Sequence, residues 1–159
     1  MNDLDDYLND HLAGSVGALE LLDRMVETYE GKPLERFFRD LREDIQHDQE
    51  QLKELIAKLG LEESAVGKAG AWFLEKLSRP KIDLGDGGKA EIGLFLGLEA
   101  LVLGITGKRS LWRALHAASR TMPQLARLDY SGLEKRAIDQ CEQVEARRLE
   151  LARSIFKAD

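Results

Sequence analysis

Apolar side chains recur every three or four residues along four long segments of this chain. In residues 3–29 they form one stripe, made of Leu4, Leu8, Leu12, Leu19, Leu22 and Val26. Residues 33–59, 89–120 and 131–157 carry stripes of the same kind. This spacing places the apolar side chains on one face of an α-helix, and that face must be buried against another element. The sequence therefore predicts an all-α protein with four long amphipathic helices.

Glycine, proline and polar residues mark where these helices begin and end. Gly31 is followed closely by Pro33, a residue suited to the first turn of a helix, so a tight turn joins the first two helices as an antiparallel hairpin. The third stripe continues through Gly107 without a break. The run Ser131–Glu134 has the form of a capping box, which predicts that the last helix opens there.

The remaining segment, residues 61–88, predicts a long crossover between the second and third helices. Ser64 is placed to cap a short helix within it that carries Trp72, Phe73 and Leu77. Two hairpins joined by one long crossover predict a four-helix bundle, and 159 residues are the usual length of one domain. We therefore expect a single domain over residues 1–159.

Composition and charge exclude several classes of partner and location. A net charge of −6 argues against nucleic-acid binding, which needs a concentrated basic face. Residues 92–106 form the longest apolar run, but it is about 15 residues long where a membrane span needs roughly 20. The acidic start MNDLDDYLND is unlike a signal peptide, and the single Cys141 fits a reducing compartment. These features predict a cytoplasmic protein without a membrane segment.

Polar residues interrupt the apolar stripes of the first and second helices. His11 and Ser15 lie on or beside the first stripe, and Asp48 lies between Ile45 and Leu52 on the second. If the hairpin folds about residue 31, Ser15 lies opposite Asp48 and His11 lies about one turn away. We therefore expect these three polar groups to converge.

Charged residues also enter the stripes of the third and fourth helices. Glu99 is the only charged residue in the run LFLGLEALVLGITG, and Arg148 lies on the last stripe with Glu145 one turn before it. A buried charge must be paired, so Arg148→Met is expected to cost about 3 to 5 kcal/mol. The predicted polar core network comprises Ser15, Asp48, Gln51, Glu99, Glu145 and Arg148. The alternative for Glu99 is an outward position that faces a partner subunit or the crossover.

The helix order and these polar positions resemble the ferritin-like superfamily. Its di-iron members place a glutamate on helices one and three and Glu-x-x-His on helices two and four. The matching positions here are Ser15, Asp48-Gln-Glu-Gln51, Glu99 and Glu145-Ala-Arg-Arg148, so neither histidine is in register. An alternative register, Asp44-Ile-Gln-His47, supplies a histidine that should face solvent. The resemblance implies a ferritin-like fold in which Arg148 replaces the positive charge of the metal.

Three functions are compatible with this sequence. The first is a non-enzymatic structural or interaction protein with a degenerate metal site, for which we expect no cofactor and no catalytic residue. Such a protein is expected to form a homodimer that packs through helix faces. The second is a metal-binding protein with iron oxidation or storage chemistry, whose ligands are His11, Asp48, Glu99 and Glu145. The third is a protein that binds a small apolar ligand between its helices.

Overall fold

The computed structural model describes residues 2–64, 75 and 88–158, and every regular element in them is helical. The four long helices are α1 (Asn2–Thr28), α2 (Pro33–Lys58), α4 (Gly88–Ala118) and α5 (Tyr130–Ile155). A short 3₁₀ helix, η1 (Pro123–Leu125), lies between α4 and α5. The prediction of an all-α chain with four long helices is confirmed.

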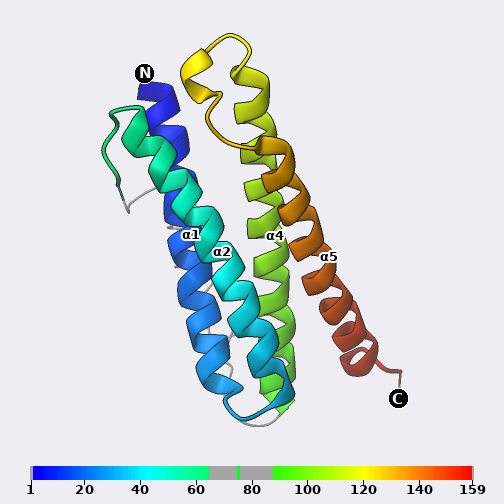
Figure 1. Cartoon of the computed structure of the whole chain (residues 1–159). Coiled ribbons are helices and arrows are strands. Elements are labelled where there is room, and N and C mark those ends of the chain that lie inside the picture. The colour runs from blue at the N-terminus through cyan, green and yellow to red at the C-terminus, as the bar shows by residue number, and fades with distance from the viewer. Residues whose placement is uncertain (1, 65–74, 76–87, 159) are drawn as a thin grey trace.

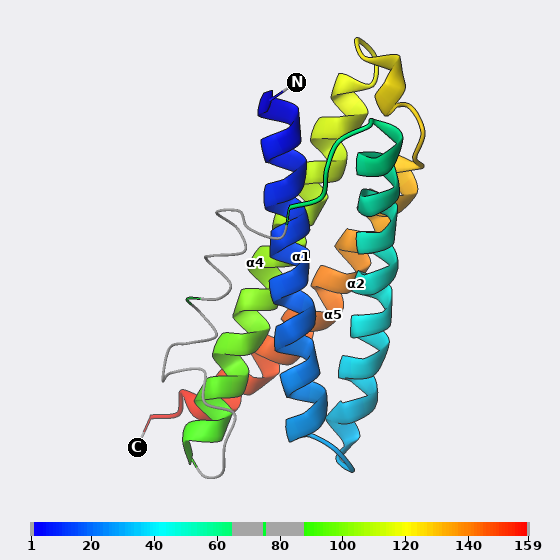
Figure 2. The same cartoon turned by 90° about the vertical axis from the view of Figure 1, so that its left-hand side faces the viewer.

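Two antiparallel hairpins make up the described structure (Figure 1). The first joins α1 to α2 through Gly31, whose φ of 76° is a conformation that favours glycine. The second joins α4 to α5, which lie side by side in both views (Figures 1 and 2). α2 and α4 run in the same direction (Figure 1), and residues 59–87 connect them in the sequence. Most of that connection, including Trp72, Phe73 and Leu77, lies outside the described residues.

The helix boundaries follow the predicted ones closely, with one correction. The third helix is continuous through Gly107, as expected. The predicted capping box at Ser131–Glu134 is wrong, because α5 already begins at Tyr130. Asp129 is the N-cap residue, and its side chain accepts a hydrogen bond of 3.0 Å from the backbone N–H of Gly132. An aspartate in this position satisfies a free amide in the same way that serine would.

The buried apolar side chains divide into two clusters along the bundle. The cluster near the α1–α2 turn contains Phe38, Leu41, Ile45, Leu98, Leu101, Ile105 and Val144. The cluster at the other end contains Leu8, Leu12, Leu52, Leu55, Trp112, Leu115 and Tyr130. On α2 the division falls between Ile45 and Leu52, and on α4 it falls between Ile105 and Leu111. The residues at this division are polar, and they form the candidate site.

α4 is the most apolar helix of the bundle. Its stretch Ala90–Ala118 is long and apolar enough to cross a membrane by length and composition, which is more than the sequence estimate for residues 92–106 allowed. A core helix of a water-soluble protein passes the same test, and Leu98, Leu101 and Ile105 of α4 are buried within the bundle.

Candidate functional site

Asp48 is the centre of a buried charge cluster between α2, α4 and α5. Its Oδ2 accepts hydrogen bonds from Lys108 Nζ at 2.7 Å and from Gln140 Nε2 at 2.8 Å. Its Oδ1 accepts one from Arg136 Nε at 2.8 Å. We call Asp48, Lys108, Arg136 and Gln140 the Asp48 cluster. Both carboxylate oxygens are thus held by donors, and two of these donors are cations.

The partners of Asp48 offset the cost of burying its charge. The Asp48 side chain has 0% of its surface exposed and that of Lys108 has 14%. Burial alone would raise the pKa of Asp48, but the charge of Lys108 and the hydrogen bonds from Gln140, Lys108 and Arg136 outweigh it and hold that pKa below its usual value. Burial lowers the pKa of Lys108, and the adjacent Asp48 carboxylate opposes that shift. This geometry favours the state in which Asp48 is deprotonated, Lys108 is protonated and the two are paired.

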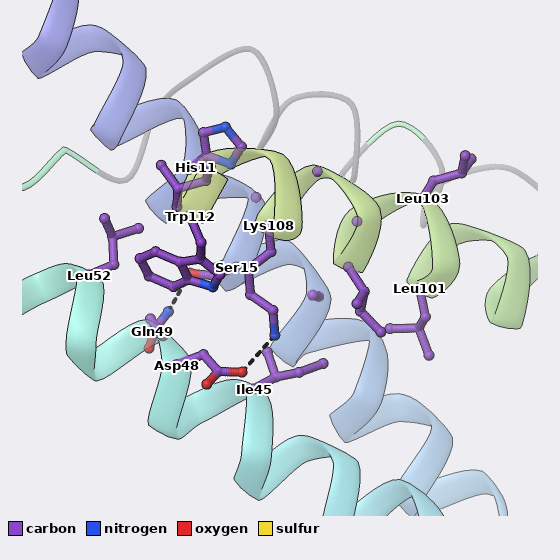
Figure 3. Close-up of a pocket in the computed structure, with 16 residues that line it drawn as sticks. His11, Ser15, Ile45, Asp48, Gln49, Leu52, Leu101, Leu103, Lys108 and Trp112 are labelled. Atoms are coloured by element: carbon purple, nitrogen blue, oxygen red, sulfur yellow. Dashed lines mark hydrogen bonds and ion pairs between the residues drawn. The ribbon is translucent and has the colours of Figure 1, made fainter. Parts of the chain in front are cut away.

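Ser15 and His11 lie near the Asp48 cluster without joining it. Ser15 Oγ accepts a hydrogen bond of 2.9 Å from Gln49 Nε2 and donates one of 2.6 Å to the backbone oxygen of Leu12 (Figure 3). Ser15 therefore meets the neighbour of Asp48 and not Asp48 itself. His11 makes an edge-on contact with Tyr7, at 4.8 Å between ring centroids, and burial lowers the pKa of its imidazole.

A second cluster, made of Glu99, Glu145 and Arg148, joins α4 to α5. Arg148 donates from Nε to Glu145 Oε2 at 2.6 Å and from Nη2 to Glu145 Oε1 at 2.5 Å. Its Nη1 lies 3.8 Å from Glu99 Oε2. We call these three residues the Arg148 cluster. The side chains are partly exposed, at 21% for Arg148, 32% for Glu145 and 45% for Glu99.

The structure divides the polar residues that were predicted to form one core network. Glu99 and Lys108 are nine residues apart on α4, which is about 13.5 Å along a helix axis. A single network of Ser15, Asp48, Gln51, Glu99, Glu145 and Arg148 is therefore wrong, because Asp48 belongs to one cluster while Glu99, Glu145 and Arg148 form a second. Among the described residues, Gln51 takes part in no hydrogen bond of either cluster, and His47 is exposed as predicted.

Three members of the Asp48 cluster were not anticipated. In the sequence Lys108 is adjacent to Arg109, and a basic pair of this kind is too small to indicate nucleic-acid binding. The position of Lys108 could have indicated its burial. It lies three residues after Ile105 and four before Trp112, on the buried stripe of α4. Gln140 is placed in the same way between Ala137 and Val144 on α5. A polar residue at such spacing marks a place where a buried partner is needed.

The proposed metal ligands do not form a metal site in this structure. In residues 2–64, 75 and 88–158, no three His, Cys, Asp or Glu side chains are grouped so that they could hold a metal ion. Asp48 is occupied by two cationic side chains, while Glu99 and Glu145 are paired with Arg148. The residues present therefore do not fit a di-iron centre. Comparison of the chain with protein-family models, with curated proteins and with solved structures finds no match.

Proposed function

We propose that this chain is a non-enzymatic, ferritin-like helical bundle that serves as a structural or interaction protein, with side-chain cations in place of the metal. The helix directions support the fold part of the proposal, because two hairpins with α2 parallel to α4 need one long crossover (Figure 1). The Asp48 cluster supports the functional part. Asp48 occupies the position that begins the degenerate Asp-x-x-Gln motif on the second helix.

The observation that carries this proposal is the contact of Lys108 and Arg136 with the two oxygens of Asp48. A divalent ion that used Asp48 as a ligand would have to displace the Lys108 ammonium and remain close to the Arg136 guanidinium. Arginine does not lose its proton in proteins, so its repulsion of a metal ion would persist at any working pH. The two cations already supply the charge that a metal would otherwise bring to the carboxylate.

The test is the metal content of protein purified without a metal-affinity tag, followed by an anaerobic titration with ferrous iron and exposure to air. We expect no stoichiometric iron and no oxidation signal. Asp48→Asn, which preserves the shape of the side chain, is the matched control and should behave in the same way. Stoichiometric iron that oxidises in air, and is lost in Asp48→Asn, would instead establish the metal-binding alternative. Sedimentation equilibrium on the same sample tests the expected homodimer.

A further inference from the structure

A cavity of about 350 Å³ lies between α1, α2 and α4, next to the Asp48 cluster (Figure 3). Aliphatic side chains and glycines make up most of its wall, with Leu52, Leu101 and Leu111 among them. An engineered apolar cavity of about 150 Å³ is large enough to hold benzene, so this one has room for a ligand of roughly twice that size. Concave, mostly apolar spaces of this size with a few polar groups are typical of small-molecule sites.

Trp112 lines this cavity and brings an unpaired hydrogen-bond donor to it. The residue is 1% exposed, and its Nε1 has no hydrogen-bond partner among the described residues. Figure 3 shows the indole nitrogen on the edge of the ring that faces Lys108. Indole N–H is a donor only, and a buried donor without an acceptor is destabilising. A ligand with an acceptor oxygen would satisfy it.

Lys108 lines the same cavity, one helical turn from Trp112. Its ammonium has three donors, of which one goes to Asp48 Oδ2 at 2.7 Å and one to Gln140 Oε1 at 2.5 Å. In the part of the chain that the structure describes, no hydrogen bond uses the third donor, which a ligand could therefore take. Arg136 and Asp44, which lie 3.9 Å apart, are both partly exposed to solvent, whereas Lys108 is the cation that lines the cavity. A charged ammonium donor forms its stronger hydrogen bonds with an ionised acceptor, so a carboxylate suits the third Lys108 donor better than a neutral oxygen does.

We infer that the cavity binds a small monocarboxylate with an apolar body. In this arrangement the ligand carboxylate accepts hydrogen bonds from Trp112 Nε1 and Lys108 Nζ. The apolar body lies between the aliphatic side chains of α1, α2 and α4. The site is independent of any metal chemistry, so the iron titration described above does not decide it.

The experiment is calorimetric titration of the full chain with decanoate, a straight-chain monocarboxylate, and with decanol as its neutral counterpart. We expect saturable 1:1 binding of decanoate, and binding of decanol that is at least tenfold weaker. In protein labelled with ¹⁵N-tryptophan, decanoate should shift the indole N–H resonance of Trp112, which Trp72→Phe separates from that of Trp72. Absence of saturable decanoate binding, or an unmoved Trp112 resonance, would overturn the inference. Decanol binding as tightly as decanoate would overturn the carboxylate assignment.

Gly107→Leu tests the location of the site. Gly107 lines the cavity, and a Cβ added there meets nothing within 4 Å, so the leucine can fill the cavity without disturbing the helix. It should weaken decanoate binding by at least tenfold, whereas the exposed substitution Ala114→Leu on the same helix should leave it unchanged. Trp112→Phe keeps an aromatic ring but removes the donor, and a loss of about five- to tenfold is expected for one hydrogen bond. Unchanged affinity in Gly107→Leu, with thermal melting showing a folded protein, would contradict the assigned site.

Discussion

The Asp48 cluster and the Arg148 cluster are built from the same kinds of residue, yet their burial is very different. The side chains of the Asp48–Lys108 pair are 0% and 14% exposed, whereas Glu99 in the Arg148 cluster is 45% exposed. Solvent-exposed ion pairs contribute little to stability, while removing one partner of a buried pair leaves an uncompensated charge. The number of charged contacts is therefore a poor guide to their importance, and burial decides which cluster holds the bundle together.

The largest effect is expected from Lys108→Met, which keeps the length of the side chain but removes the ammonium beside Asp48. Breaking a buried ion pair in this way should lower the free energy of unfolding by about 3 to 5 kcal/mol. Urea denaturation followed by circular dichroism measures the change. A loss below about 1 kcal/mol, as for an exposed pair, would show that the two clusters do not differ in the way proposed.

Arg136→Met should have an intermediate effect. The Arg136 side chain is partly exposed, and it donates to Asp48 Oδ1 and to the backbone oxygen of Asp44, at 3.1 Å. Arg136→Met removes hydrogen bonds to a charged group, and solvent access reduces the cost of that loss. We expect the free energy of unfolding to fall by about 1.5 kcal/mol in the same denaturation experiment. If Arg136→Met destabilised the protein as much as Lys108→Met does, solvent exposure would not determine how much each contact of the Asp48 cluster contributes to stability.

The dependence of stability on pH should separate Asp48 from the other carboxylates. The partners of Asp48 hold its pKa in the folded protein below that of the unfolded chain, which is about 3.9. Its contribution to stability is therefore fully present above that pH and is lost as the pH falls through the lower, folded pKa. The wild-type protein should lose stability below about pH 4 more steeply than Asp48→Asn. If the free energy of unfolding fell with pH in parallel for the two proteins, the fold would not stabilise the ionised form of Asp48.

Arg148→Met should have the smallest effect. The sequence predicted a loss of about 3 to 5 kcal/mol for this change, on the assumption that Arg148 is buried. The structure corrects that expectation, because Glu145 and Glu99 reach solvent and can be hydrated when the guanidinium is removed. A cost below about 1 kcal/mol is expected. A loss as large as that of Lys108→Met would restore the original interpretation of Arg148.

Much of the fold could be predicted from sequence because helical periodicity is a local property. The stripes of the first two segments, with Gly31 and Pro33 between them, determine the α1–α2 hairpin without reference to the rest of the chain. The exact start of α5 could not be predicted, since Asp129 and Ser131 are both good N-cap residues two positions apart. Only the backbone geometry selects between them.

The site was harder to predict because periodicity gives the direction of a side chain and not its depth. Asp48 could be found because its neighbours on the stripe are all apolar. Lys108 was missed because a lysine on an apolar stripe is usually interpreted as a surface residue whose stem covers apolar groups. Arg148 lies at a stripe position too, but that part of α5 leaves it partly open to solvent. Depth depends on contacts between helices distant in the sequence.

A double-mutant cycle on Asp48 and Lys108, measured by urea denaturation, tests the central claim most directly. Asp48→Asn, Lys108→Met and the double variant give the coupling free energy of the pair, and the same cycle on Glu145 and Arg148 provides the comparison. We predict a coupling of at least about 2 kcal/mol for the buried pair and less than about 0.5 kcal/mol for the exposed one. Additive effects at Asp48 and Lys108, or equal coupling in the two cycles, would contradict the account.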